Sequence, residues 1–150
     1  MFPNTITTSI PEFIDNSLDA MIHFTEDEWS SKPAPDKWSR KEILGHLVDS
    51  AMTNIRRLIV TQHHQNEKIV YHQNDWVQYG DYQHMNTNEL MSLWKLMNLL
   101  YHRVSQSIPA ESLEYTCDTD KDTFSPKPLS FLIEDYWGHQ QHHLRQIFKA

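Results

Sequence analysis

The sequence predicts an all-α protein, an up-and-down four-helix bundle with long crossover loops. Apolar residues recur at three- and four-residue steps in four separate stretches, which is the spacing of one helix face. The chain has only three glycines, fewer than the turns of antiparallel sheets usually need. With 150 residues and 39% hydrophobic side chains it can bury a core as one unit, so we expect a single domain over residues 1–150.

The first two helices are predicted from their ends as well as from their apolar spacing. The first should continue to about Trp29, because the proline-containing segment SSKPAPDKW follows. The second should begin at Ser39, which can form a capping box with Glu42, and continue to about Gln62. The apolar face of the first helix is expected to consist of Ile10, Phe13, Ile14, Leu18, Met21 and Ile22.

Two long connections flank the third helix. Residues 63–85 are polar and aromatic without a helical period, which indicates a long loop with a short helical turn. The third helix should follow Asn86 and stop at Pro109. Residues 110–128 form the second crossover, where the segment ESLEYTCDTD is expected to pair briefly as strands. The fourth helix should then run from about Leu129 to Phe148.

Charge and composition exclude several classes of partner. The formal net charge is −7 and no cluster of Lys and Arg interrupts it, so we expect no nucleic-acid partner. No window approaches the run of about 18 apolar residues that a membrane helix needs, and the segment MFPNTITTSIPEF lacks the features of an export signal. Cys117 is the single cysteine and cannot form an internal disulfide, which suits a reducing compartment. We therefore expect a cytoplasmic protein without membrane contact.

Three histidines are predicted to face the core. His139 and His143 are four residues apart within the apolar stripe of the fourth helix, so both imidazoles can reach one ion at the Zn–N distance of about 2.0–2.1 Å. His46 lies at the edge of the second helix's apolar face, and facing helices of a bundle build metal sites from such inward residues. A shared metal would satisfy these buried imidazoles, and packing or an internal hydrogen-bond network is the alternative. Solvated side chains are expected for His23, His63, His64, His84 and His102.

Three segments of the chain also resemble a known family. KWSRKEILGHLVDS, YHQNDWVQYGDYQ and YWGHQQHHLRQI are similar to the DinB-like superfamily, and within it to the YfiT-type metal-dependent hydrolases. The most specific parts are the histidine of GHLVDS and the H-x-x-H-H run. The resemblance implies a four-helix bundle whose metal is held by three histidines, which match His46, His139 and His143. It implies zinc or nickel as the ion, although imidazole ligands do not separate these metals from iron or cobalt.

The leading hypothesis for function is a metal-dependent hydrolase. The ion would activate a bound water for attack on an amide or ester carbonyl. Asp49, one turn beyond His46, and His142, beside His143, are candidates for outer-shell or acid–base roles. The alternatives are a solvated carboxylate for Asp49 and a position at the pocket rim for His142.

Residues for binding a small-molecule substrate are suggested mostly by the resemblance. Arg57 could hold an anionic group of the substrate. Trp76 and Tyr79, both from the first long connection, could form an aromatic wall over the site. Core packing is the alternative for these side chains.

Two other functions stay open. A thiol S-transferase would use the same ion to activate the thiolate of bacillithiol, mycothiol or glutathione. A non-enzymatic stress protein that binds a metal or a ligand would instead show saturated coordination. The sequence also leaves open a homodimer formed through exposed apolar residues of the first or third helix.

Overall fold

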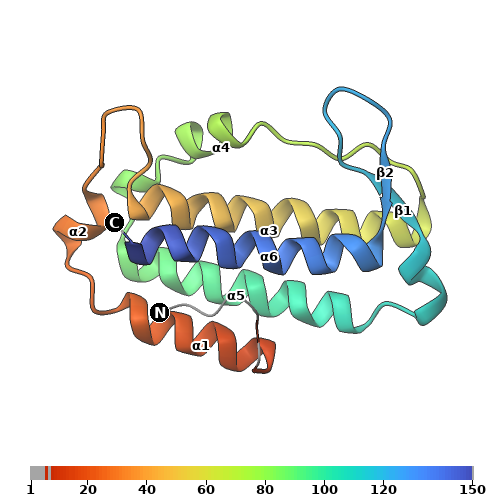
Figure 1. Ribbon diagram of the computed structural model, residues 1–150, viewed down its shortest axis with the longest axis horizontal. Coiled ribbons are helices and arrows are strands. Elements are labelled where there is room, and N and C mark those ends of the chain that lie inside the picture. Colours follow the sequence, from red (N-terminus) through yellow and green to blue (C-terminus); the bar gives the residue numbers. More distant parts are fainter. Residues whose placement is uncertain (1–5, 7, 150) are drawn as a thin grey trace.

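The helical bundle predicted from the sequence is confirmed by the computed structural model, which describes residue 6 and residues 8–149 (Figure 1). Residues 1–5 and 7 of the segment MFPNTITTSIPEF, on which the prediction of no export signal rests, lie outside the described residues. The four long helices are α1 (Ile10–Met21), α3 (Arg40–His63), α5 (Thr87–Gln106) and α6 (Leu129–Lys149). The shorter helical elements are α2 (Glu26–Ser30), α4 (Gln73–Gly80), η1 (Tyr82–His84) and η2 (Ala110–Glu114). None of the described helices is both long and apolar enough to cross a bilayer.

The first helix stops short of its predicted end near Trp29. It ends at Met21, and α2 begins separately after Thr25. The Glu28 amide donates to Thr25 Oγ1 at 3.2 Å, and the Thr25 amide donates to the Glu28 carboxylate at 2.7 Å. This capping box starts a new helix, because it satisfies two amides that would otherwise lack partners. The core assignment of Ile22 is therefore wrong: its side chain is 60% exposed, while Trp29 at the end of α2 is buried.

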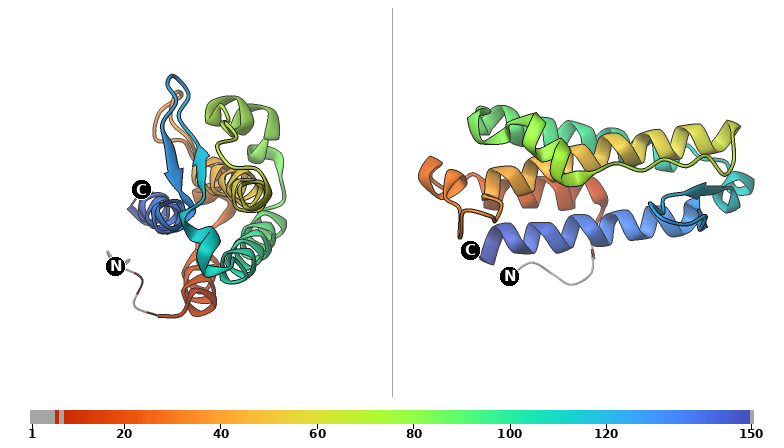
Figure 2. Two further views of the ribbon diagram at one scale, coloured as in Figure 1. Left: turned by 90° about the vertical axis from the view of Figure 1, so that its right-hand side faces the viewer. Right: turned by 90° about the horizontal axis from the view of Figure 1, so that it is seen from above.

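The first crossover makes α3 and α5 run in the same direction. After α3, the chain returns along the whole bundle before α5 begins (Figures 1 and 2). The contacts of Glu26 show that α3 and α5 begin at the same end of the bundle. Its carboxylate accepts from Lys41 at 2.6 Å near the start of α3 and from Thr87 at the start of α5. At the same end, Arg40 Nε donates to the Ile147 carbonyl of α6 at 2.8 Å. Thus α6 is antiparallel to α3, and the long connection refines the predicted bundle.

Helix α3 is the central element and begins as predicted. The Glu42 amide donates to Ser39 Oγ, and the Ser39 amide donates to the Glu42 carboxylate, both at 3.1 Å. In its first half almost no face reaches solvent, because α5, α6 and the first crossover cover it. The buried run is Leu44, Gly45, His46, Leu47, Val48, Asp49, Ser50 and Ala51. Polar side chains within such a run need partners in the interior.

The predicted strand pairing in the second crossover is also present. β1 (Thr116–Asp118) pairs antiparallel with β2 (Pro126–Pro128). The first crossover joins them, since the Ile69 amide donates to the Asp118 carbonyl at 2.9 Å. One hydrophobic cluster includes residues from all four long helices and from both crossovers. The prediction of a single domain for the entire chain agrees with this shared core and stays a prediction.

Glycine is required where η1 lies on α3. A Cβ atom built at Gly45 would lie 2.1 Å from the Tyr82 ring, at a ring atom close to the Tyr82 backbone. At Gly138 of α6, a Cβ atom would meet nothing within 4 Å. Gly45 and Gly138, each inside a long helix, therefore form a matched pair for mutation.

We expect Gly45→Ala to lower the free energy of unfolding by about 1–3 kcal/mol, because the overpacked ring must move. Gly138→Ala should raise it by up to about 1 kcal/mol through helix propensity alone. Urea denaturation followed by circular dichroism measures both. Equal stabilisation by the two substitutions would contradict the close packing of Tyr82 on α3.

Candidate metal centre

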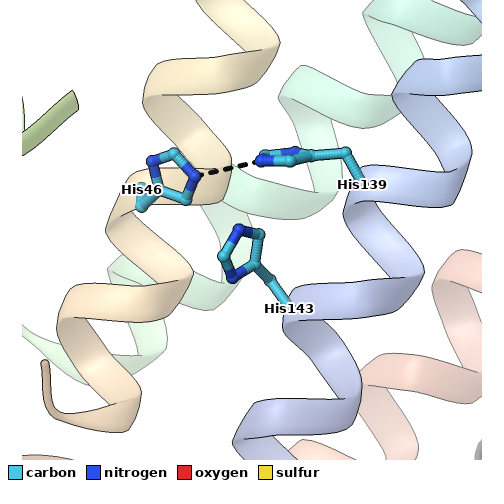
Figure 3. Close-up of side chains that lie close together, drawn as sticks. All are labelled: His46, His139 and His143. Atoms are coloured by element: carbon cyan, nitrogen blue, oxygen red, sulfur yellow. Dashed lines mark hydrogen bonds between the residues drawn. The ribbon is translucent and has the colours of Figure 1, made fainter. Parts of the chain in front are cut away.

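Three imidazoles from two helices converge at the centre of the bundle (Figure 3). His46 projects from α3, and His139 and His143 project from successive turns of α6. One nitrogen from each ring lies within 4.8 Å of the others, and Nε2 of His46 is 3.1 Å from Nε2 of His139. Two nitrogen ligands of a tetrahedral zinc ion are separated by about 3.3 Å when each Zn–N bond is about 2.0–2.1 Å. The His46 and His139 nitrogens therefore have nearly the spacing that a shared ion requires, and the nitrogen of His143 lies close enough to complete the cluster.

Burial keeps these imidazoles neutral. It lowers the pKa of His46 to about 3, and the neighbouring His139 and His143 rings add to the effect. Burial likewise lowers the pKa of His139 to about 4, with His143 as the next cause, and it lowers the pKa of His143. A neutral imidazole is the form that binds a metal, so the site does not need to lose protons before an ion enters.

A glutamine fixes the orientation of one ring. Nδ1 of His143 lies 2.8 Å from Oε1 of Gln146. Because an amide oxygen only accepts, His143 donates from Nδ1 and its Nε2 keeps a free lone pair. The side-chain nitrogen of Gln146 in turn lies 3.3 Å from Nε2 of His142. Partners of this kind hold metal-binding histidines in the required tautomer.

His46 has one orphan polar atom. Its Nδ1 is buried and has no hydrogen-bond partner among the described residues. Its Nε2 faces another imidazole, and two neutral rings facing through nitrogens can share only one hydrogen. A cation bound between them would use both Nε2 lone pairs, whereas a hydrogen bond uses one, and Nδ1 of His46 would then carry the ring hydrogen. The facing Nε2 atoms therefore suit a divalent ion.

Aromatic rings enclose His46. The Trp38 ring lies 5.1 Å and the Tyr71 ring 6.5 Å from it, measured between centroids, and Tyr71 is stacked on the imidazole. Trp76 packs edge-on against Tyr71 at 5.8 Å, so it reaches the site only through that ring. Tyr79 is 80% exposed. Of the two predicted wall residues, the structure brings Trp76 near the histidines and leaves Tyr79 at the surface.

Asp49 is buried rather than solvated. Its Oδ1 accepts a short hydrogen bond from the Tyr82 hydroxyl, while Oδ2 has no hydrogen-bond partner in the described chain. Burial raises the pKa of Asp49 to about 6, and the bond from Tyr82 partly opposes this shift. The carboxyl group is one turn from His46 and is poised to exchange a proton near neutral pH.

A pocket of about 200 Å³ opens beside His139. Arg57 lines it, donating from Nε and Nη2 to the Ile69 carbonyl at 3.0 and 2.7 Å and from Nη1 to Asn54 Oδ1 at 3.3 Å. Ser50, Tyr71, Lys121 and Asp135 also line this pocket. Of the predicted site residues, His139 and Arg57 therefore share one cavity, which we call the His139 pocket.

The remaining predicted residue, His142, is exposed on α6 with its ring centroid 5.0 Å from that of His143. The sequence patterns do not point to Tyr71, Tyr82 or Gln146 as site residues. Gln146 has a detectable signal, because it is three residues beyond His143 and four beyond His142 on a helix. The two tyrosines have none, since they reach α3 from the irregular crossover.

The comparisons with known proteins agree with this fold. A family model described as the DinB superfamily matches residues 13–147. Among curated proteins, no sequence match reaches significance.

Solved structures share the fold at low sequence identity. YfiT from Bacillus subtilis, described as a probable metal-dependent hydrolase with an unusual four-helix bundle topology, has a TM-score of 0.79 and 16% identity over 93% of this chain and 78% of that one. A mycothiol-dependent maleylpyruvate isomerase has a TM-score of 0.68 and 12% identity over 90% of this chain. A histidine-to-alanine mutant of that isomerase has a TM-score of 0.68 and 11% identity. The present chain spans 55% of the isomerase's length, and these identities show the fold alone.

The low imidazole pKa values predict a pH-dependent stability. Between about pH 4 and 6.5, the unfolded chain protonates His46 and His139 while the folded chain does not, so unfolding becomes more favourable as the pH falls. Asp49 opposes part of this trend, because its raised pKa lets the folded state bind a proton between 3.8 and about 6. We expect the metal-free chain to lose stability from pH 6.5 towards 4 in urea denaturation.

The variant His139→Gln is the control for this measurement. It removes one of the two strongly shifted imidazoles, so the slope of unfolding free energy against pH should become shallower. A metal-free chain whose stability stays constant or rises over this range would contradict the burial of neutral histidines.

Proposed function

The chain belongs to the DinB superfamily, and we propose that it is an enzyme in which His46, His139 and His143 hold one divalent metal ion. The observation that supports this proposal is the convergence of three neutral imidazoles, one buried and two half-buried, with facing nitrogens. Zinc or nickel is the proposed ion, because imidazole suits both. Within the described chain, the cluster of candidate ligands consists of these three residues, so positions remain for water or substrate.

The proposed reaction is hydrolysis of a small amide or ester. When bound, the ion would supply Lewis-acid activation of water and of the carbonyl group. The chain itself would supply proton transfer: Asp49 is the proposed acceptor, since its carboxyl group is buried, keeps one free oxygen and has a pKa raised to about 6. His142 is a second proposed proton carrier, at the exposed side of His143. Tyr82 would keep the Asp49 carboxyl oriented.

A thiol S-transferase is the second candidate. It is favoured by the polar His139 pocket and by the fold shared with a mycothiol-dependent isomerase. Both candidates take a small-molecule substrate, and Trp76 and Tyr79 would then form the outer wall of its entrance. A cytoplasmic location remains part of the proposal because Cys117 is a free, buried thiol. A homodimer stays a prediction, for which Leu96 and Leu100 on α5 offer exposed apolar side chains.

The metal site makes a sharp prediction for two adjacent residues. The native chain, offered equimolar zinc or nickel and then dialysed, should retain about one equivalent of metal by plasma mass spectrometry. His143→Ala should lose it, because only two imidazoles remain. His142→Ala should keep it, because that ring is exposed and lies outside the cluster. Equal retention by both variants would contradict the assigned ligands.

Asp49 should control the pH dependence of turnover. For Asp49→Asn we expect kcat to fall by about 10²-fold and the acidic limb near pH 6 to disappear, because the proton acceptor is lost. For Tyr82→Phe, the limb should move to higher pH, because the hydrogen bond from Tyr82 lowers the pKa of Asp49. An unchanged limb in both variants would exclude Asp49 from proton transfer.

The reaction class is tested with chromogenic p-nitrophenyl esters, assayed on the metal-loaded chain with and without a low-molecular-weight thiol. Metal-dependent release of nitrophenol without thiol, absent in His143→Ala, supports the hydrolase. Turnover that requires the thiol supports the transferase instead. Metal retention without either activity would favour a binding protein.

A further inference from the structure

We propose that the His139 pocket binds the carboxylate of a small acidic substrate, with Arg57 as its anchor. This inference rests on the proposed function for the reaction that follows binding, but the binding itself involves the chain's own residues. The lining contains two cations, Arg57 and Lys121, and one carboxylate, Asp135. The chain as a whole carries a net charge of −7, so the charged side chains of this pocket, with two cations and one anion, differ in sign from the rest of the chain.

The guanidinium of Arg57 is held in place, and in the described chain it forms no direct ion pair with a carboxylate. Its nitrogens donate to the Ile69 carbonyl and the Asn54 side-chain oxygen, both neutral acceptors. The ion pairs found in the described part of the chain do not include Arg57. Burial lowers the pKa of Arg57, and the attraction of Asp135 at longer range offsets this cost only in part. A bound anion that pairs directly with the guanidinium would recover free energy.

A purely structural role explains these contacts less well. Arg57 does tie α3 to the first crossover through Ile69. A neutral amide side chain could make a similar bond to one carbonyl without the cost of burying a charge. The fold therefore forms no direct ion pair with this charge, whereas a planar guanidinium at a cavity wall suits a carboxylate.

Lys121 is held near the same pocket by a second lysine. The ammonium group of Lys68 contacts Asp118 Oδ2 at 2.7 Å, the Asp120 carbonyl at 2.5 Å and the Thr123 carbonyl at 2.9 Å. These contacts close the loop between β1 and β2 around the ammonium group of Lys68. The same loop carries Thr119 and Lys121, which line the pocket together with Arg57 of α3.

The size of the cavity limits the acid. Sites for drug-sized ligands usually enclose about 300–1,000 Å³, and the His139 pocket has about 200 Å³. An N-acyl amino acid or a similar short acid fits that volume. Asp135 lines the pocket as well, and its negative charge would reject a second carboxylate placed there. The inferred substrate class is thus a small acid with one carboxylate.

The test compares N-acetylglycine with its neutral amide, N-acetylglycinamide, on the full-length chain. Binding is followed by NMR titration of the arginine Nε–H signals and of backbone amides. We expect the acid to bind the unaltered chain at least about tenfold more tightly than the amide. Arg57→Gln should weaken the acid by at least about tenfold and leave the amide unchanged. Arg56→Gln, an adjacent exposed arginine on α3, is the matched control and should bind like the unaltered chain.

Three results would overturn the inference: no saturable binding of the acid, equal binding of acid and amide, or equal effects of Arg57→Gln and Arg56→Gln. If circular dichroism shows that Arg57→Gln is unfolded, Lys121→Gln on the exposed loop replaces it, with an expected weakening of about threefold. Equal binding by Lys121→Gln and the unaltered chain would then overturn the inference.

Titration with and without zinc separates this inference from the proposed function. Arg57-dependent binding of the acid that persists in a chain unable to hold metal would leave the anion site standing while the metalloenzyme proposal fails. Retention of one equivalent of metal without Arg57-dependent binding of the acid would leave the metal site standing, while the proposed anion site would fail.

Discussion

The burial of polar side chains along α3 is the constraint on which the rest of the structure depends. His46 and Asp49 occupy positions that apolar residues normally fill, and each keeps a buried polar atom without a hydrogen-bond partner in the described chain. The packing of α6 against α3 supplies two more imidazoles to the first of these residues. Burying two such polar side chains within one helical turn costs desolvation free energy, so the candidate reactive groups lie inside the core rather than at the surface.

The two crossovers turn that core into a site. The first runs back along α3 and delivers Tyr71 to the face of His46 and Tyr82 to Asp49, which only a glycine at position 45 permits. The second supplies the hairpin whose loop reaches the His139 pocket. The hydrogen bond between Ile69 and Asp118 joins the crossovers, so the ring that stacks on His46 and the loop near Arg57 belong to one connected surface layer. The two long connections of this small bundle therefore serve to position side chains around the candidate site.

Much of this arrangement is predictable from local sequence. The capping box at Ser39, the strand pairing around Cys117 and the inward placement of His46, His139 and His143 all follow from short-range patterns. The break after Met21 is not predicted, because the proline-containing segment after Trp29 is taken as the first stop, although Thr25 and Glu28 carry the signal of a new helix. The direction of α5, and the contacts of Tyr71 and Tyr82 with α3, depend on a crossover without periodicity. Such contacts are set by tertiary packing, which a single sequence does not encode in local form.

The central claim is that the three imidazoles share one ion, and diffraction at the zinc absorption edge tests it most directly. Crystals of the zinc-loaded chain should show one anomalous peak within about 2.0–2.1 Å of a nitrogen of His46, His139 and His143, with no fourth protein ligand. A peak at another site, a fourth side chain that closes the coordination, or no peak in this cluster would contradict the account.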